Sequence, residues 1–275
     1  MDKDQIISLA RDFTEQSPLN LIPPGKALRP HLAGLRLYGQ PLLAFGRADD
    51  PIFDRLRQKE VVGPHHLSPR DWLPEGRTVM AFFVPFSPEV RAANARDFDW
   101  PAAEWLHGRI EGQDFIRELS AVLQLALKQA GHPSLSPLLD PRLQAVNYEE
   151  GNPMSFNSNW SERHAAHICG LGTFSLSRGL ITEKGMAGRF GTVITSLPLE
   201  PDPRRYLEYD EYCTKCGACV GRCPAGAISL ENGKEQKPCF DFQFRVLQKE
   251  KPYFGCGKCQ VGVPCEDRRP RPTGA

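Results

Sequence analysis

The sequence lacks the features that mark several large functional classes. It contains no apolar run near the roughly 18 residues that a membrane-spanning helix needs, and its start does not show the basic and then apolar layout of a signal peptide. It also lacks a Walker A loop, a Ser-His-Asp elbow and the third glycine that would extend Gly170-Leu-Gly172 to G-x-G-x-x-G. We therefore expect a cytoplasmic protein outside the nucleotide-binding and hydrolase classes.

The chain also has little net charge and no collagen-like or linker-like repeat. Its 34 basic and 33 acidic residues leave a formal charge of +1, which does not favour a nucleic-acid-binding protein. Its 25 prolines and 24 glycines predict many ordered turns. With 275 residues, of which 40% are hydrophobic, the chain can fill one large domain or two modest ones.

Cysteine, by contrast, is strongly patterned. Residues 213–224 read C-x2-C-x2-C-x3-C-P, the bacterial ferredoxin run, in which the first three thiolates hold one [4Fe-4S] cluster and the fourth ligates another. Four further cysteines follow downstream, which completes eight ligands. The pattern predicts two clusters: Cys213, Cys216, Cys219 and Cys265 for the first, and Cys223, Cys239, Cys256 and Cys259 for the second.

Two other uses of these cysteines are less consistent with the spacing. Paired C-x2-C motifs also bind structural zinc, but a zinc ribbon has no need for a third cysteine at the same spacing followed by Cys-Pro. A disulfide framework is typical of exported chains, and this pattern in a chain without a leader favours metal.

Strand and helix signals alternate along the first 200 residues. Residues 4–16 and 113–129 have the apolar periodicity of amphipathic helices, and Gly131 ends the second. Residues 78–86 form an apolar run typical of a strand buried on both faces of a sheet. Shorter strands are expected within 40–45, 141–148, 180–182 and 192–199, with a loop over 183–191. We predict an α/β (α+β) sandwich over 1–200, and a ferredoxin-like domain over 201–275, with a hairpin at Asn232-Gly233 and a helix over 240–249.

A second informative stretch runs from Asn157 to Gly172. It reads as a helix with an Asn or Ser cap and Gly170 at its end. His164 and His167 are neighbours on one face, and with Glu162 they could bind a metal, line a cofactor cavity or hydrogen-bond within the core. Cys169, the ninth cysteine, reads as a small buried residue rather than a reactive thiol. The adjacent pair His65-His66 is a weak metal candidate, because neighbouring side chains rarely converge on one ion.

Four segments of the sequence together resemble the epoxyqueuosine reductase family and its relatives, the reductive dehalogenases. They are the cysteine run, the segment from Trp160-Ser-Glu-Arg163 to Cys169-Gly-Leu-Gly172, the stretch ending Thr195-Ser-Leu-Pro-Leu199 and the closing cysteines. The order and spacing match over about residues 150 to 265. The resemblance implies a nitroreductase-like N-terminal domain that holds a base-off corrinoid (cobalamin), with two [4Fe-4S] clusters delivering electrons to it. It also implies cofactor contacts from this segment: Asn157, Trp160, Glu162, Arg163, His164, Gly170, Gly172 and Thr173.

The sequence departs from the family pattern in two places. Members that reduce epoxyqueuosine carry an aspartate proton donor where a gap-free alignment puts Phe156, with Asn157 beside it, and neither is an acid. Those members also continue past the clusters with elements that hold tRNA, so we do not expect tRNA as a substrate here. No residue is assigned a catalytic role.

Three functions follow from the sequence. The first is a reductase in which the clusters feed electrons to a cofactor or substrate in a pocket lined by residues 160–173 and 185–191. The second is a ferredoxin-type electron carrier or corrinoid-activating partner without substrate chemistry, and the third is an iron-sulfur sensor or scaffold. The reductase is favoured because a ferredoxin needs no domain of about 200 residues before its clusters. A ferredoxin or flavodoxin-like donor is the expected partner.

Overall fold

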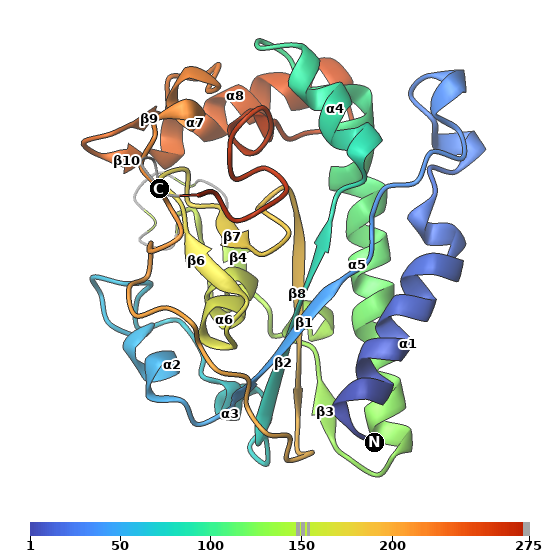
Figure 1. The fold of residues 1–275 in the computed structure, drawn as a ribbon, viewed down its shortest axis with the longest axis vertical. Helices are drawn as coiled ribbons and strands as arrows, with labels where there is room; N and C mark the ends of the chain where they lie inside the picture. The colour runs from blue at the N-terminus through green and yellow to red at the C-terminus, as the bar shows by residue number, and fades with distance from the viewer. Residues whose placement is uncertain (147–148, 150–151, 153–154, 272–275) are drawn as a thin grey trace.

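The computed structural model describes residues 1–146, 149, 152 and 155–271 and is built on an antiparallel sheet (Figure 1). The strand order is β1-β2-β8-β3, with β1 (Leu42–Arg47), β2 (Thr78–Pro85), β8 (Gly188–Thr195) and β3 (Ser134–Leu135). β2 is the predicted apolar strand, and its residues from Thr78 to Val84 are all buried. It lies between two paired neighbours and under helices on both faces, which explains why it carries no polar face.

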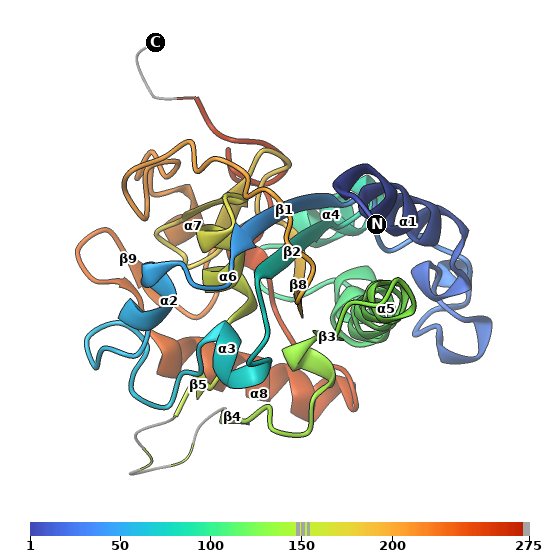
Figure 2. The same ribbon diagram turned by 90° about the horizontal axis from the view of Figure 1, so that it is seen from below.

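Helices cover each face of this sheet (Figures 1 and 2). α1 (Lys3–Gln16) and α5 (Ala103–Gln129) lie on one face, and α6 (Glu162–Ile168) lies on the other with α2 (Pro51–Arg55) outside it. Successive residues of β2 point to opposite faces, so Phe82 packs in the core under α5 and Phe83 in the core under α6. The expected α/β layering is confirmed.

α5 begins ten residues before the predicted helix, at Ala103 rather than Gln113. Gly108 and Gly112 weaken the helical signal of this first part, since glycine is a poor helix former. In the structure a Cβ at Gly108 would overlap the ring of Phe86, and one at Gly112 would overlap Tyr38. Both glycines are therefore explained by close packing against rings from elsewhere in the chain.

β8 is also displaced from the prediction: it spans Gly188–Thr195 rather than 192–199. The prediction placed Gly188 and Gly191 in a loop because glycine is typical of turns. Here each lies opposite β2, where a Cβ would overlap the ring of Phe83 or Phe82, respectively. The predicted loop over 183–191 is therefore too long.

The other elements are short. α6 confirms the helix of the 157–172 stretch, with Ser161 as its cap, while residues 157–158 form a strand rather than part of the helix. The predicted strand within 141–148 is present as β4, and residues 147–148 lie outside the described part. The remaining bounds are α3 (Pro69–Trp72), α4 (Pro88–Arg96), β4 (Ala145–Val146), β5 (Asn157–Ser158), β6 (Gly172–Phe174), β7 (Leu180–Thr182) and five 3-10 turns, η1 (Pro18–Asn20), η2 (Pro24–Lys26), η3 (Pro30–Leu32), η4 (Pro137–Leu139) and η5 (Lys258–Gln260).

The cysteine-rich part contains α7 (Ala218–Gly221), the hairpin β9 (Ile228–Ser229) and β10 (Gly233–Lys234), and α8 (Gln236–Glu250). The predicted hairpin is present, but residues 230–232 form its turn and Gly233 pairs with Ser229. The predicted helix over 240–249 is present and longer, so that Cys239 lies within it. No helix in the described part of the chain is long and apolar enough to cross a membrane.

This cysteine-rich part is anchored on α4. The ammonium group of Lys258, which is fully buried, donates to the carbonyl oxygens of Asn94 at 2.9 Å and Asp97 at 2.8 Å. Arg222 donates to the same two oxygens and to that of Ala95. Cations at the C-terminal end of a helix satisfy its last carbonyls and oppose its dipole.

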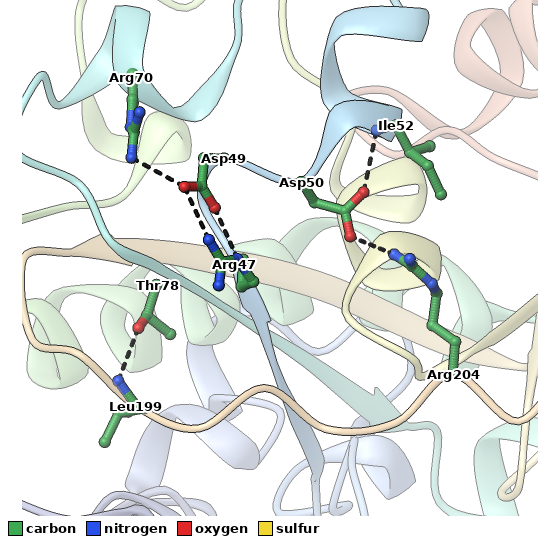
Figure 3. Close-up of polar contacts among 8 residues, drawn as sticks. All are labelled: Arg47, Asp49, Asp50, Ile52, Arg70, Thr78, Leu199 and Arg204. Atoms are coloured by element: carbon green, nitrogen blue, oxygen red, sulfur yellow. Dashed lines mark hydrogen bonds and ion pairs between the residues drawn. The ribbon is translucent and has the colours of Figure 1, made fainter.

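The segment between β8 and the cysteine-rich part is held against the first strands (Figure 3). The backbone N–H of Leu199 donates to the hydroxyl of Thr78 at 3.0 Å, and the guanidinium of Arg204 pairs with Asp50 at 2.6 Å. Asp202 accepts from Lys3 at 2.6 Å and from the backbone N–H of Phe45 at 2.9 Å. The predicted domain boundary near residue 200 therefore lies in a docked segment, and the division itself stays a prediction.

Candidate functional site

The first predicted cysteine group surrounds a small cavity of about 20 Å³. Cys213, Cys216, Cys219 and Cys265 all line it, so the end of the chain returns to the first motif as the crossed arrangement requires. Two residues in the left-handed region, Lys215 with φ 51° and Gly217 with φ 75°, turn the chain between these thiols. The backbone N–H of Leu176 donates to Cys213 Sγ at 3.4 Å.

The thiols of the second predicted group lie close enough to influence one another. Burial and, more weakly, the charges of Cys259, Cys239 and Cys223 together raise the pKa of Cys256 to about 12. The backbone N–H of Ala227 donates to Cys223 Sγ at 3.3 Å. The side-chain amide of Gln243 donates to Cys239 Sγ at the same distance. The ninth cysteine, Cys169, is fully buried in the core under α6, away from both groups.

The two groups adjoin each other. Burial raises the pKa of Cys219 to about 11, and the next largest cause is the charge of Cys259 in the other group. In the described part of the chain, no three Cys, His, Asp or Glu side chains converge as tightly as a single metal ion needs.

A set of basic side chains lies beside the second group. We call Arg109 of α5, Arg163 of α6 and Arg189 of β8 the arginine cluster. Burial and, more weakly, the charges of Arg189 and Arg163 together lower the pKa of Arg109 to about 9. Burial and the charge of Arg189 lower the pKa of Arg163, whereas the Cys259 thiolate opposes that shift. Three elements thus bring three guanidinium groups within electrostatic range of one another, and Arg163 also within range of the Cys259 thiol.

Lys234 of β10 joins these groups from the hairpin. Burial lowers the pKa of Lys234, but the charges of Cys259 and Cys239 outweigh burial and the net pKa is raised. The charge of Arg163 opposes this effect. Lys234 is therefore within electrostatic range of Cys259 and Cys239 of the second cysteine group and of Arg163.

Glu162 is the predicted site residue with the most unusual environment. It occupies the first turn of α6, where Ser161 caps the helix. Its Oε2 atom is buried and has no hydrogen-bond partner within the described residues. Burial raises the pKa of Glu162 to about 7, although hydrogen bonds to Thr192 and Trp160 lower it. A carboxyl group with this pKa can hold and release a proton near neutral pH.

The other predicted cofactor residues are engaged in packing contacts. The indole N–H of Trp160 donates to Thr192 Oγ1 at 3.0 Å, and its ring stacks on His66. A Cβ at Gly172 would overlap the carbonyl of Ile181. The remaining contacts are Asn157 Nδ2 to the Val62 carbonyl at 2.9 Å, Tyr212 N–H to Thr173 Oγ1 at 2.8 Å, His164 Nδ1 with Ser161 Oγ at 2.7 Å, and Gly170 at φ 100° after the end of α6.

Among the residues that the structure describes, the remaining histidines do not converge with other ligands on a metal site. His167 Nδ1 lies 2.8 Å from the Gly172 carbonyl. His66 is buried with neither ring nitrogen partnered, and burial lowers its pKa to about 4. Phe156 has φ 64° and its ring meets Phe240 edge to face at 5.6 Å. An aromatic side chain therefore occupies the position where an acid was expected.

Sequence reasoning did not find Arg109, Arg189 or Lys234. Arg109 and Arg189 are isolated basic residues between apolar or small neighbours, Lys234 lies between Gly233 and Glu235, and none belongs to a motif. The glycines on either side of Arg189 were the available signal, because glycine in a strand marks a close approach of other groups.

A second cavity, of about 330 Å³, lies where β1 ends and β2 begins. It is lined by Arg47, Arg70 and Arg77 together with Asp49. Asp49 is the acceptor for two of these arginines, at 2.9 Å from Arg47 and 3.3 Å from Arg70. The chain thus supplies its own carboxylate to this basic group.

Comparison with known proteins identifies similarity at both the sequence and the fold level. Residues 209–229 match a family described as a 4Fe-4S binding domain. An epoxyqueuosine reductase from Aliivibrio fischeri is 31% identical over 117 residues, covering 38% of this chain and 30% of that protein. A tetrachloroethene reductive dehalogenase from Desulfitobacterium hafniense is 43% identical over 63 residues, covering 22% and 11%, respectively. The matched segments thus span less than a third of either relative.

Solved structures show the same fold. An epoxyqueuosine reductase from Bacillus subtilis superposes with a TM-score of 0.52 at 19% identity, covering 84% of this chain and 62% of that one. A catabolic reductive dehalogenase superposes with a TM-score of 0.55 at 16% identity, covering 83% and 30%. The resemblance indicated by the cysteine run and the Gly170-Leu-Gly172 segment is confirmed.

Proposed function

We propose that this protein is an iron-sulfur reductase in which two [4Fe-4S] clusters pass electrons to a cofactor or substrate held beside the arginine cluster. The observation that carries the proposal is the arrangement of eight cysteines in two adjoining groups of four, with Cys259 of the second group next to Arg163. Similarity to epoxyqueuosine reductases and reductive dehalogenases supports a reductase.

The donor sets fit such clusters. Burial raises the pKa of Cys219, Cys256 and Cys265 to between about 11 and 12, so these thiols need a strong positive charge nearby to ionise. The iron ions of a cluster supply that charge and deprotonate the thiols outright. N–H groups directed at the sulfurs, as at Cys213 and Cys223, are the outer contacts that tune cluster potentials.

The direction of electron flow follows from exposure. Cys216 of the first group is exposed, whereas Cys259 of the second group is partly covered and adjoins the arginine cluster. We therefore assign electron entry to the first cluster, from a ferredoxin or flavodoxin-like donor, and delivery to the second cluster. Leu207 and Tyr209, which precede the first motif, are exposed large side chains on the donor side.

A corrinoid fits the described residues beside the second group. The partnerless Oε2 of Glu162 can accept a hydrogen bond from a peripheral amide, and Arg163 can donate one. When bound, a corrinoid would supply a cobalt centre for reductive removal of an oxygen or halide. The chain's own part is to hold the ligand by Arg163 and to keep a proton available at Glu162, in a nitroreductase-like domain without the aspartate that Phe156 replaces.

The experiment is anaerobic reconstitution with cobalamin, followed by EPR spectroscopy of cob(II)alamin on the desalted protein. We expect a bound cobalt signal together with reducible clusters. Intact clusters without bound cobalt would instead support the second candidate, an electron carrier or corrinoid-activating partner, which the phenyl ring at position 156 also favours.

A further inference from the structure

Two buried cations lie next to ligands of the second cysteine group. Lys258 directly precedes Cys259, and Arg222 directly precedes Cys223. Consecutive Cα atoms are about 3.8 Å apart, so each basic side chain starts close to a ligand. Lys258 is fully buried and Arg222 is 6% exposed, so little water is available to screen either charge.

The C-terminal end of α4 holds both cations in place. Both side chains donate to the carbonyl oxygens of Asn94 and Asp97. The side-chain amide of Asn94, which is itself fully buried, donates to the carbonyl oxygen of Cys256 at 3.0 Å. The same helix end therefore contacts the two cations and the backbone of a ligand of the second group.

The end of α4 does not cancel these two charges. A helix C-terminus carries about half a negative charge, whereas the cations carry two positive charges. Among the ion pairs of the described residues, none involves Lys258 or Arg222. The carboxylate of Asp97 is exposed to water and accepts from the backbone N–H groups of Asp99 at 2.6 Å and Trp100 at 3.1 Å. A net positive charge therefore remains beside the second group.

The first cysteine group differs in this respect. Two charged residues directly adjoin its ligands in the sequence, Lys215 and Glu266, and they have opposite signs. Lys215 is 66% exposed and pairs with Asp210 at 3.2 Å. Glu266, which follows Cys265, pairs with Arg91 at 3.1 Å. Each charge next to the first group thus has a partner of opposite sign.

This difference affects the two clusters of the proposed function. Reduction adds an electron to a centre that already carries about −2 with its four thiolates. Burial disfavours this added charge, whereas a fixed cation stabilises it. At an effective dielectric constant of about 20, a unit charge about 10 Å from a redox centre changes a one-electron equilibrium by about tenfold.

We propose that Lys258 and Arg222 raise the reduction potential of the second cluster above that of the first, and so direct electrons from the first cluster to the second. The inference rests on the proposed function, because it assigns these two residues a role in the same electron path. It goes beyond their structural role at the end of α4, since a structural role alone would not change a potential.

The test is a redox titration, followed by EPR spectroscopy, of the protein reconstituted anaerobically with iron and sulfide. The wild type should show two midpoint potentials. In Lys258→Met and in Arg222→Met, one of the two should become more negative by about 59 mV or more, a tenfold change for one electron, and the other should stay unchanged. Arg222→Lys keeps the charge and should keep the wild-type potentials.

Lys237→Met is the matched control. Lys237 lies two residues before Cys239, a ligand of the same second group, but it is exposed and pairs with Asp241 at 2.5 Å. The same substitution there removes a charge that water and a carboxylate already offset, so both potentials should stay unchanged.

The order of the two potentials is a second measurement that needs no cation variant, so it decides the question even where such a variant fails to bind its cluster. Cys219→Ser removes the first cluster, and the midpoint that remains should be the higher of the two wild-type values. The inference is overturned if the lower value remains, if neither cation variant with intact clusters shifts a midpoint, or if Lys237→Met shifts one equally. Iron analysis separates the claims: intact [4Fe-4S] clusters with unshifted potentials refute this inference alone, whereas a wild-type protein without such clusters refutes the proposed function.

Discussion

Gly257 is the residue whose replacement tests the second cysteine group most sharply. It lies between Cys256 and Cys259, adopts φ 66°, and leaves no room for a Cβ, which would overlap the ring of Trp105 at the start of α5. In Gly257→Ala the loop must move away from α5 or Trp105 must shift. Either movement separates the thiols of the second group and leaves the first group in place.

The expected cost has two parts. A non-glycine residue in the left-handed region costs roughly 1–2 kcal/mol, and forcing an extra carbon into a packed site costs typically about 1–3 kcal/mol. Together they give about 2–5 kcal/mol. For a chain of this size each kcal/mol lowers the melting temperature by roughly 2–4 °C, so we expect a decrease of roughly 4–20 °C.

Gly226→Ala is the matched control, because Gly226 has φ 58° in the same part of the chain but a Cβ there would meet no other atom within 4 Å. It should show only the backbone cost, roughly 1–2 kcal/mol. Anaerobic thermal melts followed by circular dichroism, with iron analysis, compare the two variants. Gly257→Ala should also lose about half of its iron. Equal melting temperatures and equal iron in the two variants would refute the reasoning.

Three further predictions concern buried ionisable groups. Burial raises the pKa of Glu162 to about 7, so the stability of the wild-type protein falls as pH rises from roughly 4.5 to 7. In urea unfolding, Glu162→Gln should therefore be about 2 kcal/mol more stable than wild type at pH 8 and equally stable at pH 4. Equal stability of the two proteins at both pH values would contradict this prediction. Burial lowers the pKa of His66 to about 4, so the stability of the wild-type protein falls as pH drops from about 6.5 to 4. His66→Phe keeps the stacking on Trp160 and should not show this fall. If the stability of His66→Phe depends on pH as that of the wild type does, the prediction is wrong. Lys258→Met removes a buried donor from the carbonyl oxygens of Asn94 and Asp97 and should lower stability by about 2 kcal/mol. An unchanged melting temperature would show that Arg222, which donates to the same two oxygens, satisfies them alone.

The features that the sequence predicts well depend on neighbours along the chain. The amphipathic helix α1 and the buried strand β2 follow from periodicity over a few residues. Ligand spacing also predicts that Cys265 returns to the first cysteine group, which it does, while the assignment of the eight cysteines to two clusters stays a prediction. These patterns are local or chemically specific, so a single sequence is sufficient for them.

The features that the sequence predicts poorly depend on contacts between residues that are far apart along the chain. Gly108 and Gly191 read as breaks in regular structure, yet they accommodate the rings of Phe86 and Phe82 within it. The arginine cluster combines residues 109, 163 and 189 from three elements, and no spacing rule connects them.

The measurement that tests the two-cluster assignment most directly is the iron and acid-labile sulfide content of the anaerobically purified chain. We predict about eight of each per chain in the wild type and in Cys169→Ser, and about four in Cys219→Ser and in Cys256→Ser, each of which removes one cluster. About two zinc ions per chain, with no absorbance near roughly 400 nm, would contradict the assignment.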